Sequence, residues 1–511
     1  MKRAFAAIVF TCPLWGAATI FNIADYGARN DGSASATASI RAAIQAAKAA
    51  GGGVVYVPAG KYVTGPIELA SNIVFDIDPG AVLQFEASRN DLSYTKGRLE
   101  GIECVTPVPL IGGHDLENVT IRGRGTITTD NAKWLALMRQ QPDARTVWMN
   151  VVRSLNLKKP ISDDDFQKAA PALRPSFIRT MNSKNVLIEG IHIIGSSMWT
   201  IHILYSENVV IRDVTIETFP GANTDGMDID SSRDVRISNC YLDTGDDAIC
   251  LKSGKDADGL RVNRPTENIA ITNCTVHHAH GAVVLGSETS GGIRNVVASN
   301  IVCEGTQKGV RIKSTRGRGG LIENIRFDHW TMENVDEAIN VTNYYTRAPE
   351  EPASERTPVF RNIAVSNMTI QGSPVAINIE GLPEMPVSGL QISNVIATAK
   401  TGMKAYNTLG LELHNVQVNA ESGPAFLIRD SKELELDGIS TRKPLADTPV
   451  VRLDRCPGAI VRGSRAFSGT GTFVSTAPGE LKEIVLDGNT VGLARKPVEE
   501  AGGDFWKTAA R

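Results

Sequence analysis

The sequence is poor in cysteine and has no long apolar run beyond its first residues. Seven cysteines in 511 residues are too few for a disulfide scaffold. No CxxC or histidine-rich spacing indicates a zinc site. The formal net charge of -3 provides no overall basic field, which argues against nucleic acid as a partner. Any attraction for an anionic partner must therefore come from a local cluster of cations.

The N-terminus has the layout of a signal peptide. Lys2 and Arg3 precede a mostly apolar stretch, residues 4–18, that ends in small residues. The stretch is too short for a comfortable membrane span. We expect residues 1–18 to be removed, which would leave a secreted or periplasmic protein without a membrane contact. A buried N-terminal strand is the alternative.

A short pattern recurs along the chain: a polar residue, then Asn or Asp, then Val or Ile, then alternating apolar residues. From residue 184 onward most consecutive copies start 23–38 residues apart. Alternation predicts strands, and a period of this size predicts a solenoid or a propeller. Clear copies are KNVLI at 184–188, ENVVI at 207–211, RDVRI at 233–237, ENIAI at 267–271 and ENIRF at 323–327.

A right-handed parallel β-helix, an all-β solenoid, fits this repeat best. Propeller blades are usually longer, and the Leu-x-x-Leu-x-Leu frame of leucine-rich repeats is absent. An Asn at a fixed place suits a left-handed turn between strands, and such Asn side chains could stack as a ladder. Cys240, Cys274 and Cys303 fall at similar places in successive repeats. We expect them to form an inward-facing column.

Two segments depart from the repeat. Residues 37–50 are rich in Ala with helical spacing, and Gly51 follows them, so we expect a helix that caps the N-terminal coils. Residues 129–175 look partly helical and predict an insertion between coils. The insertion either walls a binding groove or is a packing ornament. The predicted organisation is one catalytic β-helix domain over residues 19–500, with the cap and first coils in 19–100 and a tail at 501–511.

The residues that could carry chemistry lie in clusters about one coil apart. Asp246 and Asp247 follow Asp225 by 21 and 22 residues. Adjacent strands are about 4.8 Å apart, so carboxyls on neighbouring coils could lie roughly 5–9 Å apart. Pairs of carboxyls at such distances serve glycosidases. Crowded carboxyls also repel, so we expect one carboxyl to have a raised pKa.

Further along the chain come a histidine and a cluster of cations. His280 lies in HHAHGAVVLGSE, and KGVRIKSTRGRG follows it. Arg311 and Lys313 are two residues apart on a predicted strand, and therefore on one face. Arg binds a carboxylate through two hydrogen bonds and Lys adds a point charge. These cations predict a local anion site.

The motifs NTD, GDD, His-Gly and RIK, in this order and at this spacing, resemble glycoside hydrolase family 28, the polygalacturonase family of pectin-degrading enzymes. The resemblance covers residues 20–345 well, and the start FNIADYGARNDG and the segment WTIHIL at 199–204 belong to it. It implies hydrolysis of α-1,4-galacturonosyl linkages with inversion, without a cofactor or a metal. It also implies an anionic polysaccharide as partner: pectin, polygalacturonate or oligogalacturonides. We expect a monomer.

The resemblance also implies a role for each matching residue. Asp246 would be the general acid, while Asp225 and Asp247 would hold and deprotonate the attacking water. His280 would sustain the protonation of Asp246 or bind substrate. The remaining matches would bind substrate: Asn223, Arg311, Lys313 and, by a looser match, Tyr344 or Tyr345. The family usually has Gly-His-Gly, whereas here Ala279 precedes His280.

Several functions remain open at this point. Other members of the family act on rhamnogalacturonan or xylogalacturonan, and several bacterial members are exo-acting. The insertion could close one end of the cleft, which favours an exo mode. A pectate lyase on the same fold would use calcium and an Arg base. A non-catalytic, glycan-binding β-helix would need no acid pair.

Overall fold

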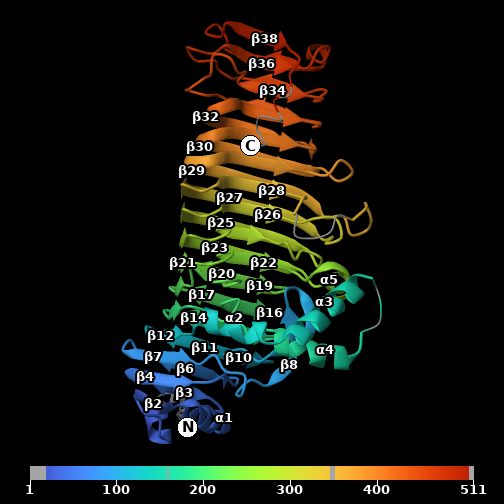
Figure 1. Ribbon diagram of the computed structural model, residues 1–511. Coiled ribbons are helices and arrows are strands. Elements are labelled where there is room, and N and C mark those ends of the chain that lie inside the picture. The colour runs from blue at the N-terminus through green and yellow to red at the C-terminus, as the bar shows by residue number, and fades with distance from the viewer. Residues whose placement is uncertain (1–18, 158, 160, 346–350, 504, 506–511) are drawn as a thin grey trace, which may run out of the picture.

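A computed structural model describes residues 19–157, 159, 161–345, 351–503 and 505. It is a column of stacked coils (Figure 1), and one sheet of 36 strands runs from β1 (Ile20–Asn22) to β38 (Lys496–Glu500). Successive coils pair in parallel throughout this sheet. The predicted parallel β-helix is therefore confirmed. The predicted signal peptide and most of the predicted tail lie outside the described residues.

Three columns of strands make up the central coils. The first column, which carries the candidate site, contains β5 (Ile67–Glu68), β10 (Ile111–His114), β13 (Ile178–Met181), β16 (Ile201–Leu204), β19 (Met227–Asp230), β22 (Ile249–Lys252), β24 (Val283–Leu285), β26 (Lys308–Lys313) and β28 (Glu337–Thr342). The second contains β3 (Gly53–Val57), β6 (Ile73–Ile77), β11 (Glu117–Gly123), β14 (Lys184–Glu189), β17 (Glu207–Arg212), β20 (Arg233–Ser238), β23 (Thr266–His277), β25 (Ile293–Glu304) and β27 (Leu321–Glu333). The third contains β4 (Gly60–Thr64), β7 (Ala81–Phe85), β12 (Thr126–Thr128), β15 (His192–Ile194), β18 (Thr215–Glu217) and β21 (Tyr241–Asp243), and continues in the second halves of β23, β25 and β27.

Toward the C-terminus the strands merge into long ones. These are β29 (Val359–Glu380), β30 (Val387–Tyr406) and β32 (Glu412–Arg429), followed by the shorter β34 (Val451–Asp454) and β36 (Thr472–Thr476). The alternation seen in the sequence places every second side chain inside the column. Ile229, Leu251, Leu285 and Ile312 are register neighbours and fully buried. They form part of one continuous apolar core.

The cysteine prediction holds in part. Cys240, Cys274 and Cys303 are buried, unpaired thiols, as expected of small inward side chains. However, the register aligns Cys274 with Ile301 and Cys303 with Val276. The expected single column of three was therefore wrong, because the third copy of the pattern carries its cysteine two residues later.

The recurring Asn residues act as the turns that the pattern predicted. Asn118, Asn185, Asn208, Asn268 and Asn295 all have positive φ between 53° and 59°, a region where Asn costs little. Their side chains form a ladder, for example from Asn208 Nδ2 to Asn185 Oδ1 at 2.7 Å. The ladder gives polar turn groups partners between coils, so the turns are stabilised along the column axis.

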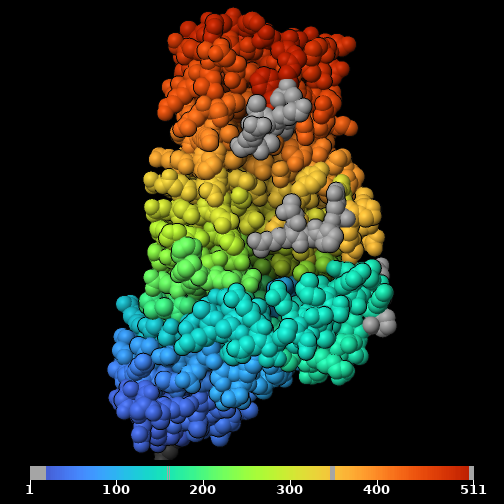
Figure 2. Space-filling view, in the orientation of Figure 1, coloured from blue at the N-terminus to red at the C-terminus, as the bar shows by residue number. Residues whose placement is uncertain are grey.

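The helices lie outside the coils. The predicted N-terminal cap is α1 (Thr37–Ala49), whose apolar face is buried on the first coils. The predicted insertion is also confirmed as partly helical, and Ser162 begins its last helix with a capping box. Figure 2 shows this segment, in cyan and teal, forming a ledge across the column. The insertion contains α2 (Asn131–Arg139), α3 (Pro142–Asn156) and α4 (Asp163–Ala169). A further helix, α5 (Asp256–Val262), lies in a later connection.

An antiparallel hairpin, β8 (Tyr94–Leu99) and β9 (Ile102–Pro107), projects from the N-terminal coils. It packs in one apolar cluster with the inserted segment, which contributes Trp148 and Val151. The sequence did not predict this hairpin, because it is a single unit outside the repeat. Among the described residues, no helix is long and apolar enough to cross a membrane.

Candidate active site

The three predicted carboxyls meet at one edge of the first strand column. Asp225 precedes β19, and Asp246 and Asp247 precede β22 on the next coil. The backbone joins these turns, since Gly226 N–H donates to Asp247 O at 2.9 Å. One carboxylate oxygen of Asp225 and one of Asp247 lie within 4.8 Å of each other. A water molecule placed between them could bond to both.

Asp247 is held in its ionised form. Lys313 Nζ donates to its Oδ2 at 2.7 Å, and Arg311 Nη1 approaches its Oδ1 at 3.4 Å. Burial alone would raise the pKa of Asp247, but the charges of Lys313, Arg311 and Lys252 outweigh it and hold the pKa below its ordinary value. A buried carboxylate that remains charged and faces a cleft suits a general base.

Asp225 behaves in the opposite way. Burial raises its pKa well above the ordinary value, and the neighbouring charges of Asp228 and Asp246 raise it further. Burial also raises the pKa of Asp228, although Lys252 Nζ lies 3.5 Å from that carboxylate. The expected upward shift therefore falls on Asp225 and Asp228, and burial contributes more to it than crowding does.

Asp246 is the more open member of the pair and lines the cleft. Its Oδ1 lies 2.8 Å from Nδ1 of His280, the predicted contact between these two residues. Arg311 Nη1 lies 3.4 Å from the carbonyl oxygen of His280. The preceding Ala279 is fully buried within the apolar core, so its methyl group packs inward. The departure from Gly at this position therefore does not displace His280 from Asp246.

The predicted substrate-binding residues are only partly gathered. Asn223 and Lys313 line a cleft of about 250 Å³ together with the three carboxyls, whereas Arg311 contacts Asp247 but is not among the described lining residues. Tyr345 lines the cleft, with Lys313 Nζ 5.3 Å from its ring centroid. Tyr344 is instead 6.1 Å from the Tyr406 ring and is not among the described lining residues. Of the two tyrosines left open by the sequence, the geometry favours Tyr345.

Sequence reasoning missed a buried lysine, Lys252, that lines the cleft beside the carboxyls. Lys252 Nζ lies 3.8 Å from Asp225, 3.3 Å from Glu288 and 4.5 Å from the Trp199 ring centroid. Lys252 ends β22 just as Lys313 ends β26, and each directly follows an inward apolar residue. That shared position was the signal available in the sequence.

The tip of the hairpin reaches the cleft. Glu100 at the tip lines the cleft, and Gly101 O accepts from Lys255 N–H at 2.9 Å. The hairpin is anchored by Arg98, whose Nη1 donates to Asp230 Oδ1 at 2.7 Å with both side chains fully buried. None of the described lining residues belongs to the inserted segment. The insertion therefore packs against the hairpin and does not itself line the described part of the cleft.

Cys250 Sγ joins the oxygens of Asp225 and Asp247 in a cluster within 4.8 Å. Metal binding would require the thiolate, but burial raises the pKa of Cys250 well above its ordinary value. Lys313 and Lys252 already supply positive charge to these carboxyls. The donor set thus fits an acid/base site better than a metal centre.

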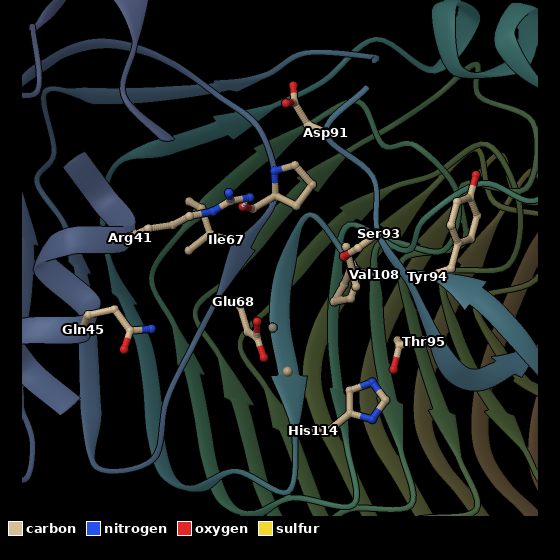
Figure 3. A pocket seen from close by; sticks show the side chains of 14 residues that line it. Arg41, Gln45, Ile67, Glu68, Asp91, Ser93, Tyr94, Thr95, Val108 and His114 are labelled. Atoms are coloured by element: carbon tan, nitrogen blue, oxygen red, sulfur yellow. Dashed lines mark hydrogen bonds between the residues drawn. The ribbon is translucent and has the colours of Figure 1, made fainter. Parts of the chain in front are cut away.

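A second hollow, of about 590 Å³, lies between α1, the first coils and the hairpin (Figure 3). Arg41 comes from α1, Glu68 and His114 from adjacent strands, and Tyr94 from the hairpin. Glu68 and Asp91 outnumber the one arginine, and burial lowers the pKa of His114, which favours its neutral form. This hollow therefore lacks the excess of cations that an anionic substrate requires.

Comparison with known proteins agrees with this geometry. A model of glycosyl hydrolases family 28 matches residues 163–420, and one of rhamnogalacturonase A/epimerase, pectate lyase-like proteins matches residues 20–249. A probable polygalacturonase of Vitis vinifera is 31% identical over 388 residues, which are 73% of this chain and 73% of the relative. An exo-poly-alpha-D-galacturonosidase of Dickeya chrysanthemi is 30% identical over 71% of this chain and 64% of its own length.

Among solved structures, an exopolygalacturonase from Thermotoga maritima matches with a TM-score of 0.73 and 35% identity. The match covers 79% of this chain and 92% of the other. The family model spans Asp225, Asp246, His280 and Arg311. The chain belongs to glycosyl hydrolases family 28 and is a glycoside hydrolase.

Proposed function

We propose that the protein hydrolyses α-1,4-galacturonosyl linkages of pectin or polygalacturonate with inversion of configuration. The observation that carries the proposal is the pair Asp225 and Asp247, whose oxygens lie within 4.8 Å, beside Asp246 at the open cleft. This arrangement leaves room for a water between two carboxyls and a separate acid for the leaving group, as inversion requires. The cations Arg311 and Lys313 beside it suit an acidic sugar.

In the proposed reaction, Asp247 takes a proton from the water, whose oxygen attacks the anomeric carbon. The bond from that carbon to the glycosidic oxygen breaks, and Asp246 donates its proton to the leaving oxygen. Asp225 retains a proton more readily because its pKa is raised. It therefore orients the water, while Asp247 is the base. His280 positions Asp246.

We further propose that the enzyme is exo-acting. Glu100 on the hairpin tip lines the cleft, and we infer that the tip blocks a polymer from continuing past this point. Relatives with exo names are 30% and 35% identical to the chain. Early digestion of polygalacturonate, resolved by anion-exchange chromatography, should release only monomer or dimer. A ladder of mixed oligomers would contradict the exo mode but not the hydrolysis.

Rhamnogalacturonan is a second candidate substrate, because the rhamnogalacturonase-like model matches residues 20–249. Its backbone also contains uronate, which the cations could bind. Parallel digestions of the two polymers decide between them. An unsaturated product that absorbs in the ultraviolet would instead indicate a lyase. We propose that residues 19–500 form one catalytic domain that acts as a secreted or periplasmic monomer.

A further inference from the structure

The inserted segment holds the loop that carries Asn223 and Asp225. Asn131, the first residue of α2, donates from Nδ2 to Ser196 O at 2.9 Å, and its Oδ1 accepts from Ala222 N–H at 3.2 Å. Arg174, at the end of the insertion, donates from Nη1 to Ser197 O at 2.7 Å and to Ala222 O at 3.0 Å. The backbone of Ala222 is thus bonded on both sides by inserted residues.

Arg174 also bonds a side chain that lines the cleft. Its Nη2 donates to Oδ1 of Asn223 at 2.8 Å. This bond assigns the carbonyl end of the amide to Arg174 and turns Nδ2, which has no acceptor among the described residues, away from it. Because Asn223 lines the cleft, its amide N–H groups are available to a sugar hydroxyl or carboxylate.

The guanidinium of Arg174 is buried, with 5% of the residue exposed, and makes no carboxylate hydrogen bond within the described residues. Burial lowers the pKa of Arg174 to about 10, and the charges of Glu100 and Asp225 partly oppose that shift. Arg174 therefore remains charged at neutral pH. Its charge polarises the Asn223 amide, which makes the N–H groups stronger donors.

We propose that Arg174 is a positioning residue for the hydrolysis, acting through Asn223 to build the sugar-binding subsite next to Asp225. Asn131 supports it by fixing the same loop. The inserted segment then contributes to substrate binding without touching the substrate. This inference rests on the proposed function and explains why an insertion that does not line the described part of the cleft is coupled to the site.

A double-mutant cycle on kcat/KM for polygalacturonate tests the inference. Arg174→Met and Asn223→Ala should each lower kcat/KM about 10–100-fold, since positioning contributes at this scale. The double variant should lose little more than Asn223→Ala alone, because Arg174 acts through that residue. Arg174→Lys should recover part of the loss, and Asn131→Ala should give a smaller loss that is also non-additive with Asn223→Ala.

Arg179→Met is the matched control. Arg179 is likewise a buried arginine, but it donates to Thr106 Oγ1 and Pro107 O of the hairpin. Arg179→Met should lower the melting temperature. In the double variant with Asn223→Ala, the two losses of kcat/KM should be additive. If the wild-type enzyme is active but the losses of kcat/KM from Arg174→Met and Asn223→Ala are additive, the inference is overturned while the proposed function stands. A wild-type enzyme that cleaves no pectic polymer would overturn the proposed function and this inference with it.

Discussion

The coils that carry the site and the coils that follow them have the same interior but different turns. Ile229 and Ile312 in the site region and Ile379 further along occupy one inward register position and are fully buried. In the site region, long connections leave the strand column, such as residues 253–265 with α5 and residues 286–292. Toward the C-terminus, β29 runs unbroken for 22 residues.

The outward positions differ in the same way. Lys313 lines the cleft and contacts Asp247, whereas its register neighbours on later coils are Thr342, Glu380 and Tyr406. Those neighbours do not line the cleft within the described residues. The repeat therefore builds a uniform scaffold, and the site exists only where turns and walls enclose the outward side chains. Substitutions in the two regions should separate these contributions.

The largest effect should come from Asp246 and Asp247, the carboxyls proposed as acid and base. Asp246→Asn and Asp247→Asn should each lower kcat at least ~10³-fold, because general acid or base catalysis is lost. Asp246→Asn should change the melting temperature little, whereas Asp247→Asn also breaks the buried ion pair with Lys313 and should lower it. The control is Asp454→Asn on β34, another buried carboxyl, which accepts from Arg452 Nε at 2.8 Å. It should alter stability and leave kcat within a few-fold. Full activity of Asp246→Asn would remove it from the role of acid.

The sequence was sufficient to predict the scaffold because repetition amplifies weak local signals. One alternating segment is ambiguous, but a polar-Asn-Val-x-Ile pattern that recurs at a fixed period predicts a coil and its left-handed turn. The same repetition predicted that Asp225 and Asp247 lie on adjacent coils. Their proximity in the structure follows directly from the pairing of β19 with β22.

What could not be predicted lies outside the repeat. The hairpin tip at Glu100 precedes Asp225 by 125 residues and the buried Arg174 precedes Asn223 by 49, and no period relates them to the site. The direction of pKa shifts was equally inaccessible. Asp225 and Asp247 are both aspartates on neighbouring turns. Lys313 bonds Asp247, whereas it does not bond Asp225, whose pKa is raised.

A second comparison concerns the shared interior. Ile229→Ala and Ile379→Ala each remove buried methyl groups from one register position. Each should therefore lower the free energy of unfolding by a similar ~2–5 kcal/mol. Denaturant unfolding followed by circular dichroism measures this loss. Only Ile229→Ala, which lies between outward-facing Asp228 and Asp230, should also lower kcat at temperatures where the variant is folded. Equal losses of kcat would contradict the separation of scaffold and site.

The smallest predicted effect concerns the charge that keeps Asp247 ionised. Lys313→Met removes the nearest cation, so the pKa of Asp247, now held below its ordinary value, should rise. A base with a higher pKa becomes protonated at higher pH. The acidic limb of kcat/KM should therefore move upward, by about one pH unit, equivalent to ~1.4 kcal/mol. Lys404→Met on β30, in the region without walls, should leave the limb in place.

The same substitution has a consequence for stability, with a definite sign. A carboxyl whose pKa is lower in the folded protein stabilises it above the pKa of the unfolded chain and loses this contribution as the pH falls through the folded value. Wild-type stability should therefore decrease more steeply than that of Lys313→Met as the solution is acidified below pH ~4. Thermal unfolding at several acidic pH values measures both slopes. If stability falls with pH at the same rate in the wild type and in Lys313→Met, and the acidic limb of kcat/KM does not move, then Lys313 does not control the ionisation of Asp247.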